Sequence, residues 1–540
     1  MLGNRKNLMQ LFWPVLLETL FGTFMGTIDT WMIASLGDKA VGAVGTANAY
    51  LELLIFMLNI VAVGVPAVMT QYVGAGRFHS AHQVRHAGLL MNCGFGLAIS
   101  ILILLLARPI LNLLGIASEL ADYATVYFRI IGGTCIINAL IPIFSSHLRS
   151  FGYTRKPFLA ALASSIVDVA LNAIAVFVLH AGVMGVAVAT VLARLVNLSL
   201  VMTWSLSLSR RQQSAESTPI PVILRQILKI GVPPTVENIA YNVSVTILLS
   251  FLNQMDPTGF HATARSYTLQ IMNFAGCASS AFSTANCIIV GWNVAVGNFE
   301  ECRRSSKKAC LLGMSCALVI GSLLTLTAPV YLRFFTEDAQ MQRVVRMLML
   351  INIPTKMGLT INICYENGLK TIGDGRFPMI VGSILMIFWA GCGSWLFGMQ
   401  LGWMSVGVMI AMCLDECTRG LCMVVRWRTG KWQKMALIHA DRLSLPLVRV
   451  SLIFARRHAL DPFEGFRQTR DGSEAHYFRD LGNAHFPFRQ KRAGPLDAGR
   501  VQKGNHAEAR HFLEGMGQIV FAYIEPRAQI VQIRDAFKVL

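Results

Sequence analysis

The sequence predicts an all-α polytopic membrane protein of twelve transmembrane helices in two pseudo-symmetric six-helix lobes, followed by a poorly ordered C-terminal tail. Three observations lead to this fold class. Of the 540 residues, 54% are hydrophobic and only 14% are charged. Apolar runs long enough to cross a bilayer recur along the chain, and the second half repeats landmarks of the first. Because soluble proteins carry about 25% charged residues, this composition argues strongly against a soluble enzyme of this size.

The predicted spans are apolar segments of about 20 residues or more, enough to cross about 30 Å of hydrocarbon. They lie at 9–35, 45–72, 87–107, 121–145, 158–179, 185–207, 231–253, 264–292, 309–330, 344–369, 378–399 and 402–424. Gly and Pro interrupt several of them, which membrane helices tolerate where neighbouring helices satisfy the backbone.

Lys and Arg alternate in density from loop to loop. The N-terminus and every second loop carry 21 of them, whereas the intervening loops hold five: Lys39, Arg108, Arg265, Arg333 and Arg343. Because basic loops stay on the cytoplasmic side, both termini are predicted to be cytoplasmic and the protein to lie in the cell (inner) membrane. Basic loops also account for the net charge of +18, so no nucleic-acid partner is predicted.

An internal repeat divides the membrane part. Four landmarks recur at offsets of 219 to 221 residues: Pro14-x-x-x-Glu18 as Pro233-x-x-x-Glu237, Gly76-Arg77-Phe78 as Gly297-Asn298-Phe299, Gly152-x-x-Arg155-x-Pro157 as Gly373-x-x-Arg376-x-Pro378, and Gly182 as Gly402. Each unit holds six spans, an even number, so both units have the same orientation. They should be related by a pseudo-two-fold axis along the membrane normal.

The predicted domains follow from this repeat. Residues 1–208 form the N-lobe with spans one to six, and 229–434 form the C-lobe with spans seven to twelve. Between them, 209–228 is polar, basic and Pro-bearing, which is typical of a cytoplasmic linker. Residues 435–540 form an Arg- and His-rich tail without sustained periodicity, predicted to be disordered.

Motifs of soluble chemistry are missing from the sequence. It holds no GxxxxGK[ST] phosphate loop, no HExxH and no GxSxG, so neither ATP use nor the commonest hydrolases are predicted. No CxxC pair or Cys/His metal spacing occurs either. The chain is therefore expected not to be an enzyme and to need no cofactor.

Acids inside the predicted spans are functional candidates, because an ionisable group in a bilayer costs about 2.5 kcal/mol or more. Glu18 and Asp29 share one stripe of the first span, about 20° apart around the helix and roughly 16 Å apart along it. A desolvated carboxylate can exchange a proton, or it can bind Na⁺ with carbonyl and amide oxygens. Each acid could instead be only hydrogen-bonded between helices. Glu366, Asp415 and Glu416 are expected nearer helix ends, where a charge is cheaper.

Two further polar groups lie in later spans. Asp168 and Asn172 are four residues apart in the fifth span and face the same way, so they could coordinate a cation, steer a proton or make a plain helix contact. The seventh span opens the second repeat with Glu237 and Asn238, followed one turn later by Tyr241. Arg129 and Arg194 also fall within spans, where each could pair with an acid or extend to an interface.

The order of several short motifs resembles the multidrug and toxic compound extrusion (MATE) transporters. The motifs are Pro14-x-x-x-Glu18, Gly26-Thr27-Ile28-Asp29-Thr30, Leu36-Gly37, Ala43-Val44-Gly45, Gln71-Tyr72-Val73-Gly74-Ala75-Gly76, and Leu369-Lys370-x-x-Gly373-Asp374-x-Arg376-Phe377-Pro378. The likeness covers about residues 5–430. It implies two six-helix lobes around a central cleft and drug/cation antiport by alternating access.

The resemblance also implies roles for particular residues. Asp29 occupies the place of a span-one acid that is linked to proton or sodium coupling in the family. One branch of the family has an Asn-x-x-x-Asp pair in span five; here the order is reversed, as Asp168-x-x-x-Asn172, which moves the carboxylate by one turn. A span-seven acid of another branch falls near Tyr241, one turn beyond Glu237. Asp374 matches an acid in the turn of the second lobe, where it could equally cap the following helix.

Together these features predict a secondary active exporter of small organic, cationic or amphipathic molecules, working as a monomer in the lipid bilayer. H⁺ or Na⁺ is the expected coupling ion, with Na⁺, if used, bound at Asp29, Asp168 and Asn172. One alternative is a lipid-linked or polysaccharide flippase of related architecture; such proteins line the cleft with many basic residues, and only Arg129 and Arg194 are candidates for that. The other alternative is a membrane enzyme or scaffold without a transport cycle.

Overall fold

A computed structural model of the chain describes residues 6–113, 120–210, 218–334 and 336–435. The chain divides into two units, residues 1–444 and 445–540. The helices described below all belong to the first unit. The predicted tail, 435–540, lies outside the described residues except for Met435.

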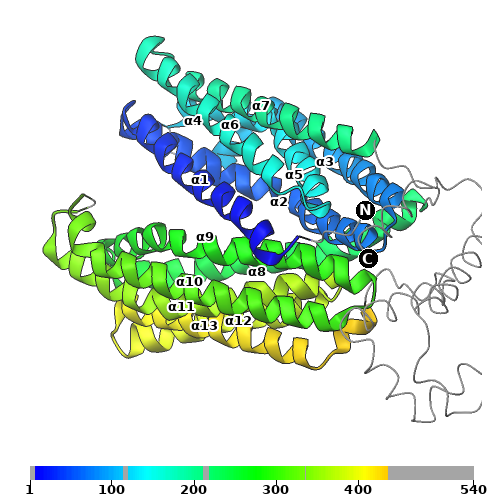
Figure 1. Cartoon of the computed structure of the whole chain (residues 1–540). Helices are drawn as coiled ribbons and strands as arrows, with labels where there is room; N and C mark the ends of the chain where they lie inside the picture. The colour runs from blue at the N-terminus through cyan, green and yellow to red at the C-terminus, as the bar shows by residue number, and fades with distance from the viewer. Residues whose placement is uncertain (1–5, 114–119, 211–217, 335, 436–540) are drawn as a thin grey trace, which may run out of the picture. The chain divides into compact units, whose positions relative to one another are not determined.

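Two helical bundles make up the first unit (Figure 1). The N-lobe consists of α1 (Leu8–Ala34), α2 (Asp38–Gly74), α3 (Phe78–Leu113), α4 (Ala121–Gly133), α5 (Cys135–Ser150), α6 (Arg155–Ala173) with the π-helix η1 (Ile174–Val178), and α7 (Gly182–Arg210). The C-lobe consists of α8 (Ile220–Met255), α9 (Phe260–Ala295), α10 (Phe299–Tyr331), α11 (Ala339–Ile372), α12 (Arg376–Phe388) with the π-helix η3 (Trp389–Gln400), and α13 (Met404–Arg428). The 3-10 helices η2 (Leu332–Phe334) and η4 (Lys431–Met435) follow α10 and α13.

Every predicted span coincides with one of these helices or with a consecutive helix pair. Among the described residues, ten helices are long and apolar enough to cross a membrane. The pair α4 and α5, bent by 42°, raises the number to eleven. The remaining predicted span, α13, carries Asp415, Glu416 and Arg419 near its middle and is therefore not among these apolar helices. The all-helical polytopic fold is confirmed.

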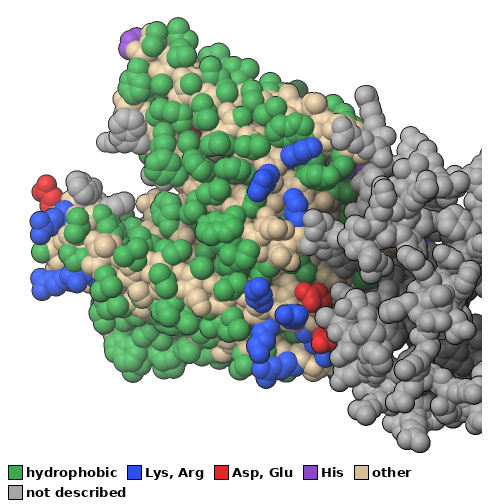
Figure 2. All heavy atoms as spheres, in the orientation of Figure 1, with side chains coloured by type: hydrophobic (Ala, Val, Ile, Leu, Met, Phe, Trp, Pro, Cys, Tyr) green, Lys and Arg blue, Asp and Glu red, His purple; other side chains and the backbone are tan. Residues whose placement is uncertain are grey.

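The flanks of both bundles are apolar. Leu105, Val319 and Leu326 expose 72%, 65% and 78% of their surface, which water would disfavour and lipid would solvate. Figure 2 shows hydrophobic side chains over most of the face in view, with Lys and Arg toward the ends of the bundles. The surface thus matches a multi-pass membrane protein.

The internal repeat appears as matched turns. Gly76 and Gly297 have φ of 77° and 72°, a left-handed conformation that favours glycine. In each turn the next residue donates its backbone N–H to a carbonyl five residues earlier, Arg77 to Tyr72 and Asn298 to Asn293, at 3.0 and 2.9 Å. The landmarks therefore recur because the same helix-ending turn is built twice.

The two lobes pack together at the end of the bundles that holds these turns, which we call the basic end. One buried apolar cluster there draws on both lobes and includes Phe12 and Phe282, whose rings stack with centroids 3.8 Å apart. Toward the opposite end the clusters are separate, one in each lobe. In Figure 1, α1 begins beside α9 and diverges from it toward the other end. Close approach requires glycine at Gly74, where a Cβ would lie 2.5 Å from the carbonyl oxygen of Trp292.

Two hydrogen bonds cross between the lobes at the basic end in a symmetric pattern. Gln71 Nε2 donates to the carbonyl oxygen of Thr371, and Trp292 Nε1 donates to that of Ser150, each at 2.7 Å. An offset of 221 residues relates both the donors and the acceptors. Each acceptor lies in the last turn of a helix, where carbonyls lack an intrahelical donor. These bonds hold the basic end closed.

Replacing Trp292 with Phe should loosen this closure. The variant loses one buried hydrogen bond of about 1 kcal/mol, which corresponds to roughly fivefold in an equilibrium. Hydrogen exchange of the full chain in detergent should therefore be about fivefold faster in peptides that cover 60–76 and 285–297.

The matched control is Trp432→Phe, because Trp432 Nε1 makes the same kind of bond, 2.7 Å to the carbonyl of Trp427, within the C-lobe. Equal acceleration of these peptides in both variants, or none in Trp292→Phe, would show that the bond does not hold the lobes together.

The linker differs from its predicted extent. Helix α8 begins at Ile220, so 220–228, assigned above to the linker, is helical. Pro221 lies in the first turn of α8, where proline is favoured because its missing N–H needs no partner. Residues 211–217 lie outside the described ranges.

Candidate functional site

In the N-lobe, α1 and α6 bring two carboxylates to one amide. Asn172 Nδ2 lies 3.3 Å from Oδ1 of Asp29 and 3.3 Å from Oδ1 of Asp168. Asn172 is fully buried, whereas both acids are partly exposed. The i, i+4 spacing on α6 places Asp168 and Asn172 on one face, and the packing of α1 against α6 delivers Asp29. Three of the predicted site residues therefore form one cluster.

The surroundings of this cluster contain one cation for two carboxylates. Arg194 of α7 acts electrostatically on both Asp29 and Asp168, without an ion pair to either among the described residues. Tyr127 of α4 also lies within electrostatic range of both acids and is hydrogen-bonded to Asn48. Arg129, the other basic candidate, is exposed on α4. With one excess negative charge, the cluster can hold a proton or a small cation.

Glu18 lies outside this cluster. Its Oε1 accepts a hydrogen bond of 2.5 Å from Arg149 Nη2, at the last turn of α5. The stripe on α1 does place Glu18 and Asp29 on one side of the helix, but the distance between them along the axis puts them in different surroundings. Glu18 is therefore half of an ion pair near the basic end.

The C-lobe repeats this ion pair. Lys370 Nζ lies 2.8 Å from Glu237 Oε2, and Lys370 also bonds Glu366, one turn earlier on α11. Offsets of 219 and 221 residues relate Glu237 to Glu18 and Lys370 to Arg149. All three side chains of the C-lobe group are at least 90% buried. One cation thus bridges two acids.

Glu237, Asn238 and Tyr241 line a cavity of about 350 Å³ within the C-lobe, formed between α8, α9, α11, α12, η3 and α13. The i, i+4 spacing puts Glu237 and Tyr241 on one face of α8, as the sequence predicts. The volume of the cavity is within the range of ligand pockets in proteins. The N-lobe cluster and this cavity draw on separate lobes, so the predicted site residues divide into two groups.

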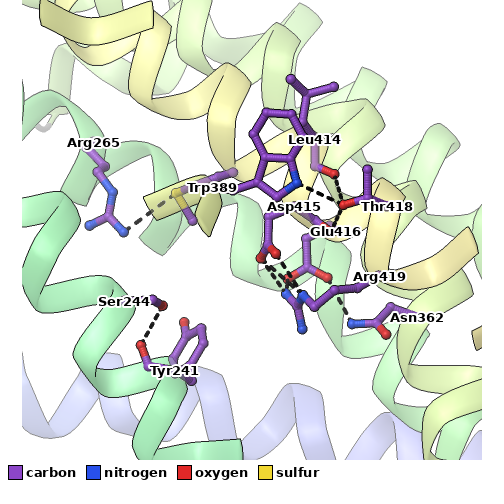
Figure 3. A network of polar contacts seen from close by, with 11 residues as sticks. Tyr241, Ser244, Arg265, Asn362, Trp389, Leu414, Asp415, Glu416, Thr418 and Arg419 are labelled. Carbon is purple, nitrogen blue, oxygen red and sulfur yellow. Dashed lines mark hydrogen bonds and ion pairs between the residues drawn. The ribbon is translucent and has the colours of Figure 1, made fainter. Parts of the chain in front are cut away.

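A second acid–base group closes the cavity on the side of α13 (Figure 3). Arg419 Nη2 lies 2.8 Å from Asp415 Oδ2 and 2.6 Å from Glu416 Oε1, and Asn362 Nδ2 donates to Glu416 Oε2 at 3.2 Å. The expectation that Asp415 and Glu416 lie near a helix end is wrong, because they occupy the middle of α13. Glu366 lies within two turns of the end of α11 but is only 7% exposed. These acids are stabilised by ion pairs with a cation and not by contact with water.

Asp374 forms an ion pair that connects two segments of the C-lobe. Arg426 Nε and Nη2 donate to its two carboxylate oxygens at 2.8 and 3.3 Å, which joins the turn after α11 to the end of α13. Asp374 is 3% exposed and does not line the cavity.

No group of three or more His, Cys, Asp and Glu side chains in the described ranges is arranged to hold a metal ion. Asp29, Asp168 and Asn172 supply two carboxylates and one amide, and the Oδ1 of Asn172 has no hydrogen-bond partner among the described atoms. These oxygens are the kind that Na⁺ prefers, but the amide now turns its N–H₂ toward both acids.

Sequence reasoning missed the basic residues of the C-lobe cavity, which are Lys356, Lys370 and Arg419. Lys356 and Arg419 lie inside the tenth and twelfth predicted spans, so each was visible as a charge in an apolar run. The i, i+4 pairs Glu366–Lys370 and Asp415–Arg419 were also readable as local ion pairs. The statement that only Arg129 and Arg194 could line a cleft is therefore wrong.

Comparison with known proteins gives consistent matches. The family model MatE matches twice, over residues 14–174 and 233–390. The uncharacterized transporter YisQ of Bacillus subtilis is 30% identical over 438 residues, which cover 79% of this chain and 94% of that protein. The probable multidrug resistance protein NorM of Thermotoga maritima is 23% identical over 81% of this chain and 95% of its own length.

Solved structures share the fold. An outward-facing multidrug resistance MATE family transporter of the MOP superfamily superposes with a TM-score of 0.73 at 19% identity, over 79% of this chain and 96% of that one. A MOP superfamily transporter from Pyrococcus furiosus gives 0.70 at 19% identity, over 78% and 94%. The double match of the family model begins at Pro14 and Pro233, the first landmark of the repeat.

Proposed function

This chain belongs to the MATE family of membrane transporters, and we propose that it is a secondary active multidrug exporter that exchanges small organic molecules for H⁺ or Na⁺ by alternating access of its lobes. The observation that carries the proposal is the N-lobe cluster, in which Asn172 joins Asp29 to Asp168. Membership of a transporter family also speaks against the enzyme or scaffold alternative. Relatives named as multidrug resistance proteins support small organic substrates.

The N-lobe cluster favours H⁺ as the coupling ion. A proton can bind between Asp29 and Asp168 while Asn172 keeps its present orientation. A sodium ion would need the Asn172 amide to turn its oxygen toward the acids, because its N–H₂ now faces both of them. Protonation removes one of two mutually repelling charges, which changes how α1 and α6 pack and so couples the ion to the lobe.

The closed basic end supports an outward-facing state. If the basic loops are cytoplasmic, the bonds from Gln71 and Trp292 seal the lobes on the cytoplasmic side. Export then requires these bonds to break so that substrate enters from the cytoplasm, and to re-form when the lobes open outward. Because each candidate site lies within one lobe of one chain, the proposed unit is a monomer in the cell membrane, with both termini cytoplasmic.

The test is dye efflux from vesicles that contain the purified chain, driven by one imposed gradient at a time. A pH gradient should drive ethidium against its own gradient, whereas a Na⁺ gradient at equal pH should not. Efflux driven by Na⁺ alone would replace H⁺ with Na⁺ in the proposal. If neither gradient drives efflux, the proposal of secondary active export is wrong for this dye.

A further inference from the structure

The C-lobe cavity holds one cation that the mechanism above leaves unused. Lys370 bridges Glu237 and Glu366, and Arg419 bridges Asp415 and Glu416, so two of the three cations that line the cavity are each paired with two acids. Lys356 is the third. None of the described side chains forms a hydrogen bond or an ion pair with its ammonium group, although Glu416 acts on it electrostatically. Its ammonium is therefore available to a ligand.

Lys356 forms part of the wall of the cavity. Lys356 lies in the middle of α11, half-buried, and it is one of the lining residues. Across from it stands Gly276 of α9, at which an added Cβ would lie 3.5 Å from the Lys356 Nζ. The side chain thus lies between α11 and α9 and is partly shielded from water.

Two acceptors that line the cavity also lack partners. Asn352 lies one turn before Lys356 on the same helix, and Asn362 lies further along it; both line the cavity and are 1% exposed. Within the described part of the chain, Oδ1 of each forms no hydrogen bond, while Nδ2 of Asn362 is used by Glu416. Buried acceptors are normally hydrogen-bonded, so a donor from a ligand would complete both.

Part of the remaining lining is apolar, and the rest is polar: Asn238, Tyr241, Ser244 and Thr355. The apolar part includes Leu248, Leu269, Met386, Trp389 and Met412. Such a wall buries the ring system of an organic molecule, and methionine side chains adapt to different shapes. Four carboxylates against three cations leave a formal excess of one negative charge, so a simple anion would be repelled and a simple cation would leave Lys356 unused.

We propose that the C-lobe cavity is a binding site for amphoteric organic molecules, with a carboxylate of the ligand at Lys356, N–H donors at Asn352 and Asn362, and an aromatic body against the apolar wall. This inference rests on the proposed export function and names a substrate class for it. It differs from the cationic substrates expected from the sequence, because an ammonium without a partner selects for a negative group.

A pair of dyes that differ only by a methyl ester tests the carboxylate. Rhodamine 110 carries a free carboxylate and a cationic ring system, and rhodamine 123 is its methyl ester. Binding of each dye to the purified full chain is measured by fluorescence polarisation. Lys356→Met should weaken binding of rhodamine 110 by about tenfold or more and change binding of rhodamine 123 by less than about twofold, because only the carboxylate loses a charged partner.

Two further variants separate charge from folding. Lys356→Arg should restore most of the affinity for rhodamine 110, since the positive charge remains. Lys308→Met, at an exposed lysine of α10, should leave both affinities unchanged. Equal weakening of both dyes by Lys356→Met, no weakening of rhodamine 110, or no binding of rhodamine 110 to the wild-type chain would overturn the inference.

Failure of the proposed function would look different. If a pH or Na⁺ gradient drives neither dye out of vesicles while the Lys356-dependent difference in binding persists, the export proposal is wrong and the amphoteric site stands. If rhodamine 123 is exported but the binding difference is missing, the export proposal stands and the amphoteric site is wrong.

Discussion

Asp29→Asn is expected to reduce gradient-driven dye efflux to the background of protein-free vesicles. The substitution keeps the size of the side chain and an oxygen that can accept the hydrogen bond from Asn172. It removes the negative charge of Asp29. The side chain at position 29 can then no longer bind and release a proton beside Asp168. The chain should stay folded, which its elution as a single species in detergent and its unfolding temperature would report. Unchanged efflux would remove Asp29 from the mechanism.

Glu18→Gln is the matched control, because it makes the same chemical change on the same helix. Glu18 is paired with Arg149 near the basic end and lies outside the N-lobe cluster. Partly exposed ion pairs contribute only about 0–1 kcal/mol, so efflux should stay within about twofold of the wild-type rate. A loss as large as that of Asp29→Asn would place Glu18 in the coupling site after all.

Lys370→Met should destabilise the C-lobe severely. Removing the cation leaves Glu237 and Glu366 buried without a partner, and breaking a buried pair in this way costs about 3–5 kcal/mol. Unfolding by SDS, followed through tryptophan fluorescence in mixed micelles, should therefore begin at a clearly lower SDS fraction than in the wild-type chain.

A compensated variant distinguishes lost charge balance from lost packing. Lys370→Met combined with Glu237→Gln and Glu366→Gln removes all three charges, and buried ionic groups can often be replaced by neutral ones at little cost. It should recover most of the stability. If Lys370→Met unfolds like the wild-type chain, or if the triple variant is no more stable than the single one, the group does not act as a charge-balanced unit.

The path of the chain could be predicted from the sequence because it depends on local properties. Apolar length fixes most of the spans, and positive-φ glycines such as Gly76 and Gly297 fix the turns, so the repeat and the helix order follow from one-dimensional patterns. The i, i+4 rule also placed Asp168 beside Asn172. That Asp29 of another helix joins Asp168 and Asn172 was predicted only through the family resemblance.

What could not be predicted depends on contacts between helices. Asp415 and Glu416 look costly in the middle of a span until Arg419 is seen to pair with both. The hydrogen bond from Trp292 is accepted by the backbone carbonyl of Ser150, so the type of residue at position 150 does not reveal it. Lys356 was visible as a charge, but its lack of a partner is a property of the packed C-lobe.

The N-lobe and C-lobe groups differ in how closely their charges are paired, and we expect them to have different roles in the proposed cycle. The N-lobe cluster has two carboxylates that share one amide, and Arg194 acts on both without forming a described ion pair, so its charge can change with ion binding. The acid–base groups of the C-lobe cavity are held by close ion pairs, which keeps the shape of the cavity. Ion coupling would then reside in one lobe and ligand selection in the other.

The most direct test of proton coupling through Asp29 is to measure the proton that leaves when a substrate enters. Vesicles that contain the chain and the pH dye pyranine, in medium of equal pH, receive ethidium on the outside. For the wild-type chain we expect ethidium entry to be accompanied by a rise in lumenal pH, and for Asp29→Asn we expect no rise. The same rise in both proteins, or ethidium entry through the wild-type chain without any rise, would contradict proton coupling at Asp29.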